Sequence, residues 1–137
     1  MAVSALHHVG FVVPAMAPAL RRWVDEGAVV LVEPIDDPIQ RVTVALLDVD
    51  GTMPVELVAP IDPEDSPVSG RLKRGGGLDH FCYTVPDVAT ALAAEEERGS
   101  MIICPPVFAV AFTRTIAFVQ RRTGLVVEYI SEAEVTA

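Results

Sequence analysis

The sequence predicts an α+β protein made of two tandem βαβββ modules. Three observations predict this class: an internal repeat at one offset, strand and helix patterns in the same order in both copies, and a polar segment between the copies. A chain of 137 residues is the size of one domain and can bury one substantial core. We therefore expect a single domain, 1–137, with modules at about 5–59 and 77–131 and a linker at 60–76.

The internal repeat is the strongest of these observations. Leu6-His7-His8 reappears as Leu78-Asp79-His80, which sets an offset of 72 (78 − 6). The same offset, without a gap, relates Val13-Pro14 to Val85-Pro86, Ala19-Leu20 to Ala91-Leu92, Gly27 to Gly99, Pro34 to Pro106, and Val55-Glu56 to Val127-Glu128. Chance rarely keeps one register across so many positions, so the pattern indicates a gene duplication followed by fusion.

The first copy begins with a β-rich run, Leu6–Val13, which ends at Pro14 because proline suits the first turn of a helix. Apolar residues at helical spacing predict a helix over Met16–Glu26, with Gly27 as its C-cap. Three strands should follow, at about Val29–Val32, Arg41–Asp48 and Pro54–Val58, with a turn at Asp50-Gly51.

The second copy repeats this order, with a strand at Phe81–Val85, a helix at Val88–Arg98 and a C-cap at Gly99. The acidic run Glu95–Glu97 is expected to be a solvated helix face. Its three later strands are predicted at about Met101–Cys104, Thr113–Gln120 and Leu125–Ile130, with a turn at Thr123-Gly124, and the linker holds a possible short helix at Ser66–Lys73.

Charge and composition exclude several classes of partner. The net charge of −9 argues against nucleic acid and anionic membranes. No apolar stretch approaches the roughly 20 residues that span a bilayer, and the first residues do not read as a signal peptide, so we expect a cytoplasmic location. Cys82 and Cys104 are too few for a disulfide framework and are expected to be small buried hydrophobes. The basic residues Arg71, Lys73 and Arg74 face either an anionic small molecule or solvent.

Four polar residues lie in predicted strands where β-patterning favours apolar side chains. His8 and His80 lie early in the first strand of each module, and Glu56 and Glu128 lie inside the last. A carboxylate on a buried sheet face is costly unless a cation or hydrogen bonds compensate it. Because the repeat places the two pairs equivalently, we predict that all four bind one divalent ion. Imidazole nitrogen and carboxylate oxygen suit Zn, Ni, Co, Fe or Mn.

Taken singly, each of these residues has a more ordinary interpretation. A strand histidine is usually a core or surface residue, and a strand glutamate usually points to water. Recurrence of all four at one offset favours the metal. The neighbours His7 and Asp79 should point to the opposite face by strand alternation, so they are not predicted ligands.

The repeat, the strand histidines and the terminal-strand glutamates resemble the vicinal oxygen chelate superfamily, which includes glyoxalase I, methylmalonyl-CoA epimerase and extradiol dioxygenases. The resemblance covers essentially the whole chain and implies a cupped mixed β-sheet around a metal. Methylmalonyl-CoA epimerase is the most similar subgroup, through Val55–Pro60, Ser66–Val68, Leu72, Gly77–His80, Arg114–Phe118 and Gly124–Glu128.

By that resemblance His8, His80 and Glu128 take ligand positions. Glu56 stands where the epimerases usually have Gln and where glyoxalase I has Glu. The predicted substrate-binding residues are Ser66 and Arg114, from the matching stretches, and Arg71, from the basic cluster.

Two positions depart from the epimerase pattern. Val44 aligns with a further glutamate base of the epimerases, and Ala111-Phe112-Thr113 stands where they have a Gly-Gly pair, which changes the pocket. The predicted catalytic base is therefore Glu56, which can replace the base lost at Val44, or Glu128.

The leading prediction is a metal-dependent isomerase or epimerase of a small carbonyl or acyl-CoA compound, acting through a metal-stabilised enolate. Two alternatives stay open: a non-catalytic antibiotic-binding protein of the same fold, and a dioxygenase with Fe(II) on His8, His80 and Glu128. The resemblance also implies a homodimer.

Overall fold

The computed structural model describes residues 5–132. The described residues divide into two compact units: the first unit is His8–Asp79, and the second unit consists of residues 5–7 together with residues 80–132. The elements, in order, are β1 (Ala5–Val12), α1 (Met16–Asp25), β2 (Val29–Asp37), β3 (Val42–Val49), β4 (Met53–Pro60), α2 (Ser69–Lys73), β5 (Gly77–Val85), α3 (Val88–Glu97), β6 (Met101–Ala109), β7 (Arg114–Gln120) and β8 (Val126–Ser131). The predicted β-α-β-β-β order is thus confirmed in both copies.

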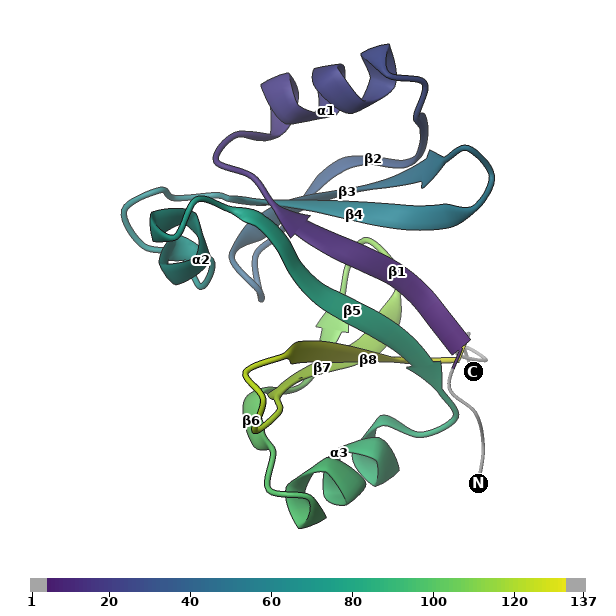
Figure 1. Ribbon diagram of the computed structural model, residues 1–137, viewed down its shortest axis with the longest axis vertical. Coiled ribbons are helices and arrows are strands. Elements are labelled where there is room, and N and C mark those ends of the chain that lie inside the picture. The colour runs from purple at the N-terminus through teal and green to yellow at the C-terminus, as the bar shows by residue number, and fades with distance from the viewer. Residues whose placement is uncertain (1–4, 133–137) are drawn as a thin grey trace. The chain divides into compact units, whose positions relative to one another are not determined.

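In the first unit, β2 pairs with β3 and β3 with β4, both antiparallel, while β1 lies parallel to β4. Helix α1 covers one face of these strands (Figure 1), where it packs through Trp23 onto a core of Leu47, Val55 and Leu57. Residues of β4 alternate between faces, so Glu56 points away from α1.

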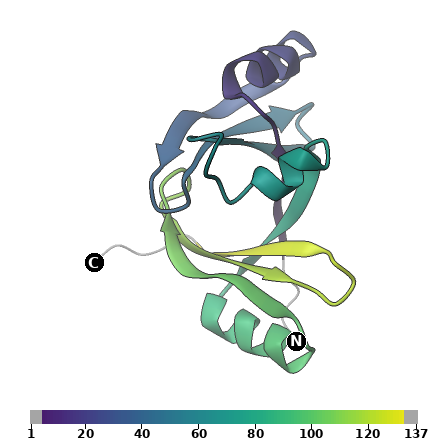
Figure 2. The same ribbon diagram turned by 90° about the vertical axis from the view of Figure 1, so that its left-hand side faces the viewer.

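The second unit repeats this pairing: β6 with β7 and β7 with β8 are antiparallel, and β5 lies parallel to β8. Figure 2 shows α3 beside the β7–β8 strands. The face toward α3 carries Val127 and Tyr129 beside Leu92 of the helix, and the opposite face carries Cys82 and Ile130.

The two long helices begin differently for a local reason. The Asp87 carboxylate accepts a hydrogen bond from the Thr90 backbone N–H at 3.2 Å, which caps α3. Ala15, the equivalent residue 72 positions earlier, makes no side-chain cap. Pro18 stands at the position of Thr90 and has no N–H to cap.

Strands β2 and β6 run further than the sequence predicted, through Pro34 and Pro106. Each is the outermost strand of its unit, and proline is tolerated there because the outer edge needs no N–H donor. The pairing of both strands is irregular around the prolines. The strands predicted to end at about Val32 and Cys104 therefore continue to Asp37 and Ala109, and the edge location explains the difference.

The linker contains α2, within the predicted short helix, followed by three glycines at Gly75–Gly77 with positive φ. A Cβ on Gly76 would lie 2.8 Å from the Val12 carbonyl oxygen, so this turn needs glycine to pass the end of β1. That the two modules form a single domain stays a prediction. None of the helices within residues 5–132 has the length and apolar character needed to cross a membrane.

The cysteine prediction is confirmed in part. Neither Cys82 nor Cys104 forms a disulfide within the described residues; Cys82 is fully buried, and Cys104 is half-buried on the outer strand β6. The solvated acidic face is confirmed for Glu96 and Glu97 and is wrong for Glu95, which is buried. Glu95 lies three residues after the buried Leu92, so both side chains lie on the helix face that packs on the sheet.

Candidate functional site

The first unit brings His8 of β1 and Glu56 of β4 together on the face away from α1. The two strands are parallel neighbours, with Gly10 beside Glu56 in the register. The His8 Nε2 lies 3.3 Å from the Glu56 Oε1, and the two residues are 0% and 5% exposed. The unit therefore holds a buried imidazole–carboxylate pair.

The second unit holds the equivalent pair, His80 of β5 and Glu128 of β8. The Nε2–Oε1 distance is 3.2 Å, and each residue is 2% exposed. The edge of the His80 ring meets Phe118, with ring centroids 5.1 Å apart. The same pairing of side chains thus recurs in both units, as the repeat predicts.

The chemistry of each pair fits a divalent cation. A buried carboxylate needs a positive partner, and a protonated imidazole or a metal ion can supply the charge. Each unit presents one imidazole nitrogen and one carboxylate oxygen close together, and these donors suit Zn, Co, Ni, Mn or Fe. The described residues are thus consistent with the predicted ligand types.

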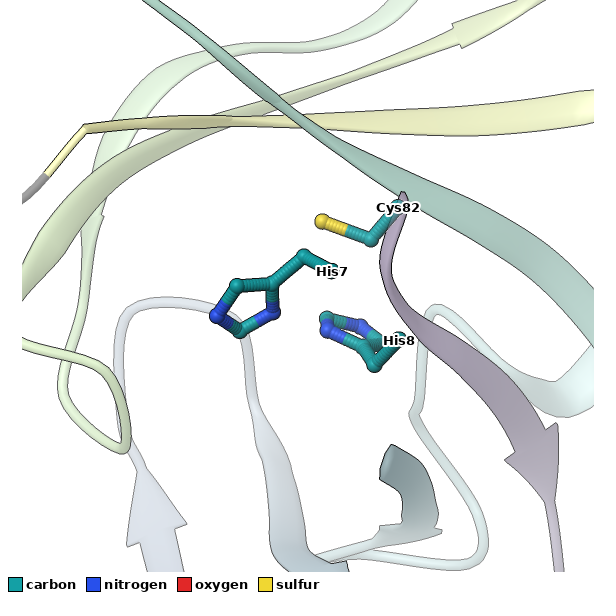
Figure 3. A group of neighbouring side chains, drawn as sticks. All are labelled: His7, His8 and Cys82. Atoms are coloured by element: carbon teal, nitrogen blue, oxygen red, sulfur yellow. The ribbon is translucent and has the colours of Figure 1, made fainter. Parts of the chain in front are cut away.

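His7, the neighbour of the proposed ligand His8, makes contacts that the sequence analysis did not predict. Its ring edge meets Phe112, with centroids 5.2 Å apart, and a ring nitrogen lies within 4.8 Å of the Cys82 Sγ. Figure 3 draws His7 and Cys82 together with His8, the next residue of β1. Cys82 shares a face of β5 with His80, because the two are two residues apart. His7 therefore lies beside a face that carries a candidate ligand, which strand alternation did not predict.

Of the predicted substrate-binding residues, Ser66 lies just before α2 and Arg71 lies within it, both in the first unit. The Ser66 Oγ accepts a hydrogen bond from the Val68 N–H at 3.3 Å, and the Arg71 Nε donates to the Leu78 carbonyl at 3.1 Å. Arg114 begins β7 in the other unit and is half-buried. These contacts give local roles to Ser66 and Arg71, and substrate binding by all three stays a prediction.

Val44, the position that the resemblance matches to an epimerase base, lies on the same face of its unit as Glu56. Leu46 pairs directly with Glu56 across β3 and β4, and Val44 lies two residues from Leu46 on the same strand. Val44 is 5% exposed. A carboxylate at position 44 would therefore face the same side as Glu56.

Comparison with known proteins defines the class. The sequence profile of the glyoxalase/bleomycin resistance protein/dioxygenase superfamily matches residues 7–133, so the chain belongs to this superfamily. Among curated proteins it is similar to an ethylmalonyl-CoA/methylmalonyl-CoA epimerase of Cereibacter sphaeroides, with 30% identity over 103 residues that cover 74% of this chain and 75% of the relative.

Solved structures agree with the predicted fold. A hypothetical protein from Bacillus halodurans matches with a TM-score of 0.82 and 26% identity, covering 99% of both chains. The methylmalonyl-CoA epimerase of Mycobacterium tuberculosis matches with a TM-score of 0.81 and 24% identity, covering 98% of this chain and 93% of that one. The expected vicinal oxygen chelate fold and the likeness to epimerases are both confirmed.

Proposed function

We propose that this protein is a metal-dependent epimerase or isomerase of a small carbonyl compound, with an acyl-CoA thioester as the favoured substrate class. The observation that carries the proposal is the buried His–Glu pair that recurs in both units. The relationship to an acyl-CoA epimerase supports the reaction class and the substrate class.

The proposed metal ligands are His8, Glu56, His80 and Glu128, which together would supply two nitrogens and two oxygens to one divalent ion. A bound ion of this kind acts as a Lewis acid, which polarises a carbonyl group and stabilises negative charge on its oxygen. The removal of an α-proton from a thioester places negative charge on that oxygen.

The chain's own residues would move the proton. A carboxylate at the end of a flexible side chain can take a proton from the α-carbon and return it. Glu56 is the favoured base, because Val44 supplies no carboxylate at the position that the resemblance aligns with the epimerase base, and Glu56 lies on the same face of the first unit. Glu128 is the other candidate, and epimerisation, which removes a proton on one side of a carbon and returns it on the other, can use both.

Proton exchange at the α-carbon tests the proposal directly. Purified protein should contain one divalent ion per chain by elemental analysis. In deuterated water it should introduce deuterium at the α-carbon of methylmalonyl-CoA, as followed by mass spectrometry. Chelator-treated protein is the matched control and should lose the exchange, and adding back Co²⁺ or Mn²⁺ should restore it.

Other outcomes of the same experiment identify the alternatives. Protein without stoichiometric metal and without exchange would contradict the proposal and favour a non-catalytic binding protein. Oxygen uptake by protein loaded anaerobically with Fe(II), again without exchange, would favour a dioxygenase that uses His8, His80 and Glu128.

We also propose a homodimer, which is supported by apolar side chains on both outer strands. Val29 and Leu31 of β2 are 60% and 52% exposed, and their repeat equivalents Met101 and Ile103 of β6 are 59% and 48% exposed. Exposed apolar side chains on strand edges favour association with another chain.

Light scattering should give twice the mass of one chain at micromolar concentration. Leu31→Lys should lower that mass toward the monomer, because a charge enters the apolar stripe. Val24→Lys is the control, since Val24 is an exposed apolar residue of α1 rather than of an outer strand. A monomeric wild-type protein would contradict the proposal.

A further inference from the structure

A buried polar network joins α3 to the sheet of the second unit. The Glu95 carboxylate of α3, in a residue only 5% exposed, accepts a hydrogen bond from the Tyr129 hydroxyl at 3.1 Å and another from the Ser100 hydroxyl at 2.9 Å. The Arg121 Nε lies 3.4 Å from the Glu95 Oε1, and the same guanidinium donates to the Tyr129 hydroxyl at 3.4 Å. The carboxylate therefore has partners on both oxygens.

The repeat shows that the fold does not require this polarity. An offset of 72 takes Glu95, Ser100, Arg121 and Tyr129 to Trp23, Ala28, Val49 and Leu57. All four belong to the apolar cluster between α1 and its sheet. The first unit thus fills the same four positions with hydrophobic contacts, and the second has replaced them with a hydrogen-bonded network.

Replacing buried apolar contacts with a polar network is not expected to raise the free energy of unfolding. Buried charged groups lose hydration, and packed hydrophobic residues of similar volume are often equally or more stable. What a network of this kind can provide is a defined orientation, because hydrogen bonds are directional whereas apolar contacts tolerate small rotations.

The network meets the strand that carries a proposed metal ligand. Tyr129 directly follows Glu128 on β8, so its ring lies on the α3 face while Glu128 lies on the opposite face beside His80. The Tyr129 hydroxyl donates its hydrogen bond to the Glu95 carboxylate on this face. Fixing Tyr129 fixes the rotation of β8 at Glu128.

We propose that Glu95, Tyr129 and Arg121 are positioning residues that hold Glu128 in a fixed orientation as a metal ligand. Glu56 lies on a strand that is held on the equivalent side only by the apolar contacts of Leu57 with its cluster, so Glu56 is then the ligand with more freedom to leave the ion and move a proton. This inference rests on the proposed function, because it divides the two carboxylates of the proposed site into a fixed ligand and a mobile one.

Tyr129→Phe tests the inference, since it removes the hydroxyl and keeps the ring. We expect the affinity for Co²⁺ to fall by about 10-fold or more, in the range found for outer partners of metal ligands, and the visible spectrum of bound Co²⁺ to change. Val119→Ala is the matched control, because Val119 is fully buried in the same cluster under α3 and its apolar side chain contributes no hydrogen bond to the network. It should lower stability while leaving Co²⁺ affinity and spectrum unchanged.

A second readout needs no metal. Hydrogen–deuterium exchange of metal-free Tyr129→Phe should be faster than wild type over Val126–Ser131 and unchanged over Met53–Pro60. If Tyr129→Phe matches Val119→Ala in Co²⁺ affinity, spectrum and exchange, the positioning role is overturned. If wild-type protein takes up no Co²⁺, the proposed metal site fails, and unchanged exchange in β8 would then show separately that the network does not hold this strand.

Discussion

Glu56→Gln is expected to keep the metal and to lower turnover by about 10²- to 10⁴-fold, the usual contribution of a positioned general base. Glutamine has nearly the same shape as glutamate and keeps an oxygen that can bind the ion, but its amide cannot accept a proton from carbon. The α-proton exchange rate of metal-loaded variant and wild type, compared at equal metal content, measures the effect.

Two further variants make this prediction specific. Glu128→Gln should lower metal affinity more than Glu56→Gln, because Glu128 is the ligand inferred to be fixed. In a Glu56→Gln background, Val44→Glu should restore part of the exchange, because position 44 lies on the same face as Glu56. Unchanged turnover in Glu56→Gln would remove Glu56 from the mechanism.

His8→Ala is expected to abolish binding of the single ion, although His80 and Glu128 remain intact in the other unit. An ion held by four donors loses a direct bond when His8 is removed. The dissociation constant of the ion should therefore rise by more than about 100-fold, since even indirect partners of metal ligands contribute about 10- to 100-fold. Isothermal titration with Co²⁺ or Mn²⁺ gives both the affinity and the number of ions per chain.

The stoichiometry decides whether the two His–Glu pairs share an ion. One ion per chain in wild type and none in His8→Ala is the expected result. Two ions in wild type, with one remaining in His8→Ala, would mean that each pair binds its own metal. Leu6→Ala is the control from the same strand, because Leu6 is an exposed apolar residue of β1 and is not a proposed ligand.

The candidate ligands could be predicted from the sequence because duplication makes a weak signal visible twice. A single histidine or glutamate in a strand does not by itself indicate a metal site. The recurrence of His8 and Glu56 as His80 and Glu128, at one offset of 72, does indicate one. The structure adds that each histidine meets the glutamate of its own unit at 3.2–3.3 Å, through parallel pairing of β1 with β4 and of β5 with β8.

The burial of Glu95 and its place in a hydrogen-bonded network could not be predicted from the repeat. In the sequence it is the first of three adjacent glutamates, and such a run usually faces water. Its burial depends on Tyr129, Ser100 and Arg121, of which Tyr129 lies 34 residues further along the chain. No local pattern records those partners, since they meet only when α3 packs on the sheet.

The sequence by itself determined the βαβββ order, the duplication and the identity of the four candidate ligands, because strand alternation, helical spacing and repeat register are properties of short segments. Only the tertiary structure decided which side chains become neighbours within each unit. It placed Glu95 beside Tyr129, His7 beside Phe112, and β2 and β6 at sheet edges where proline is tolerated. The physical reason is that burial of a polar group depends on partners distant in sequence, and packing alone brings them within hydrogen-bonding distance.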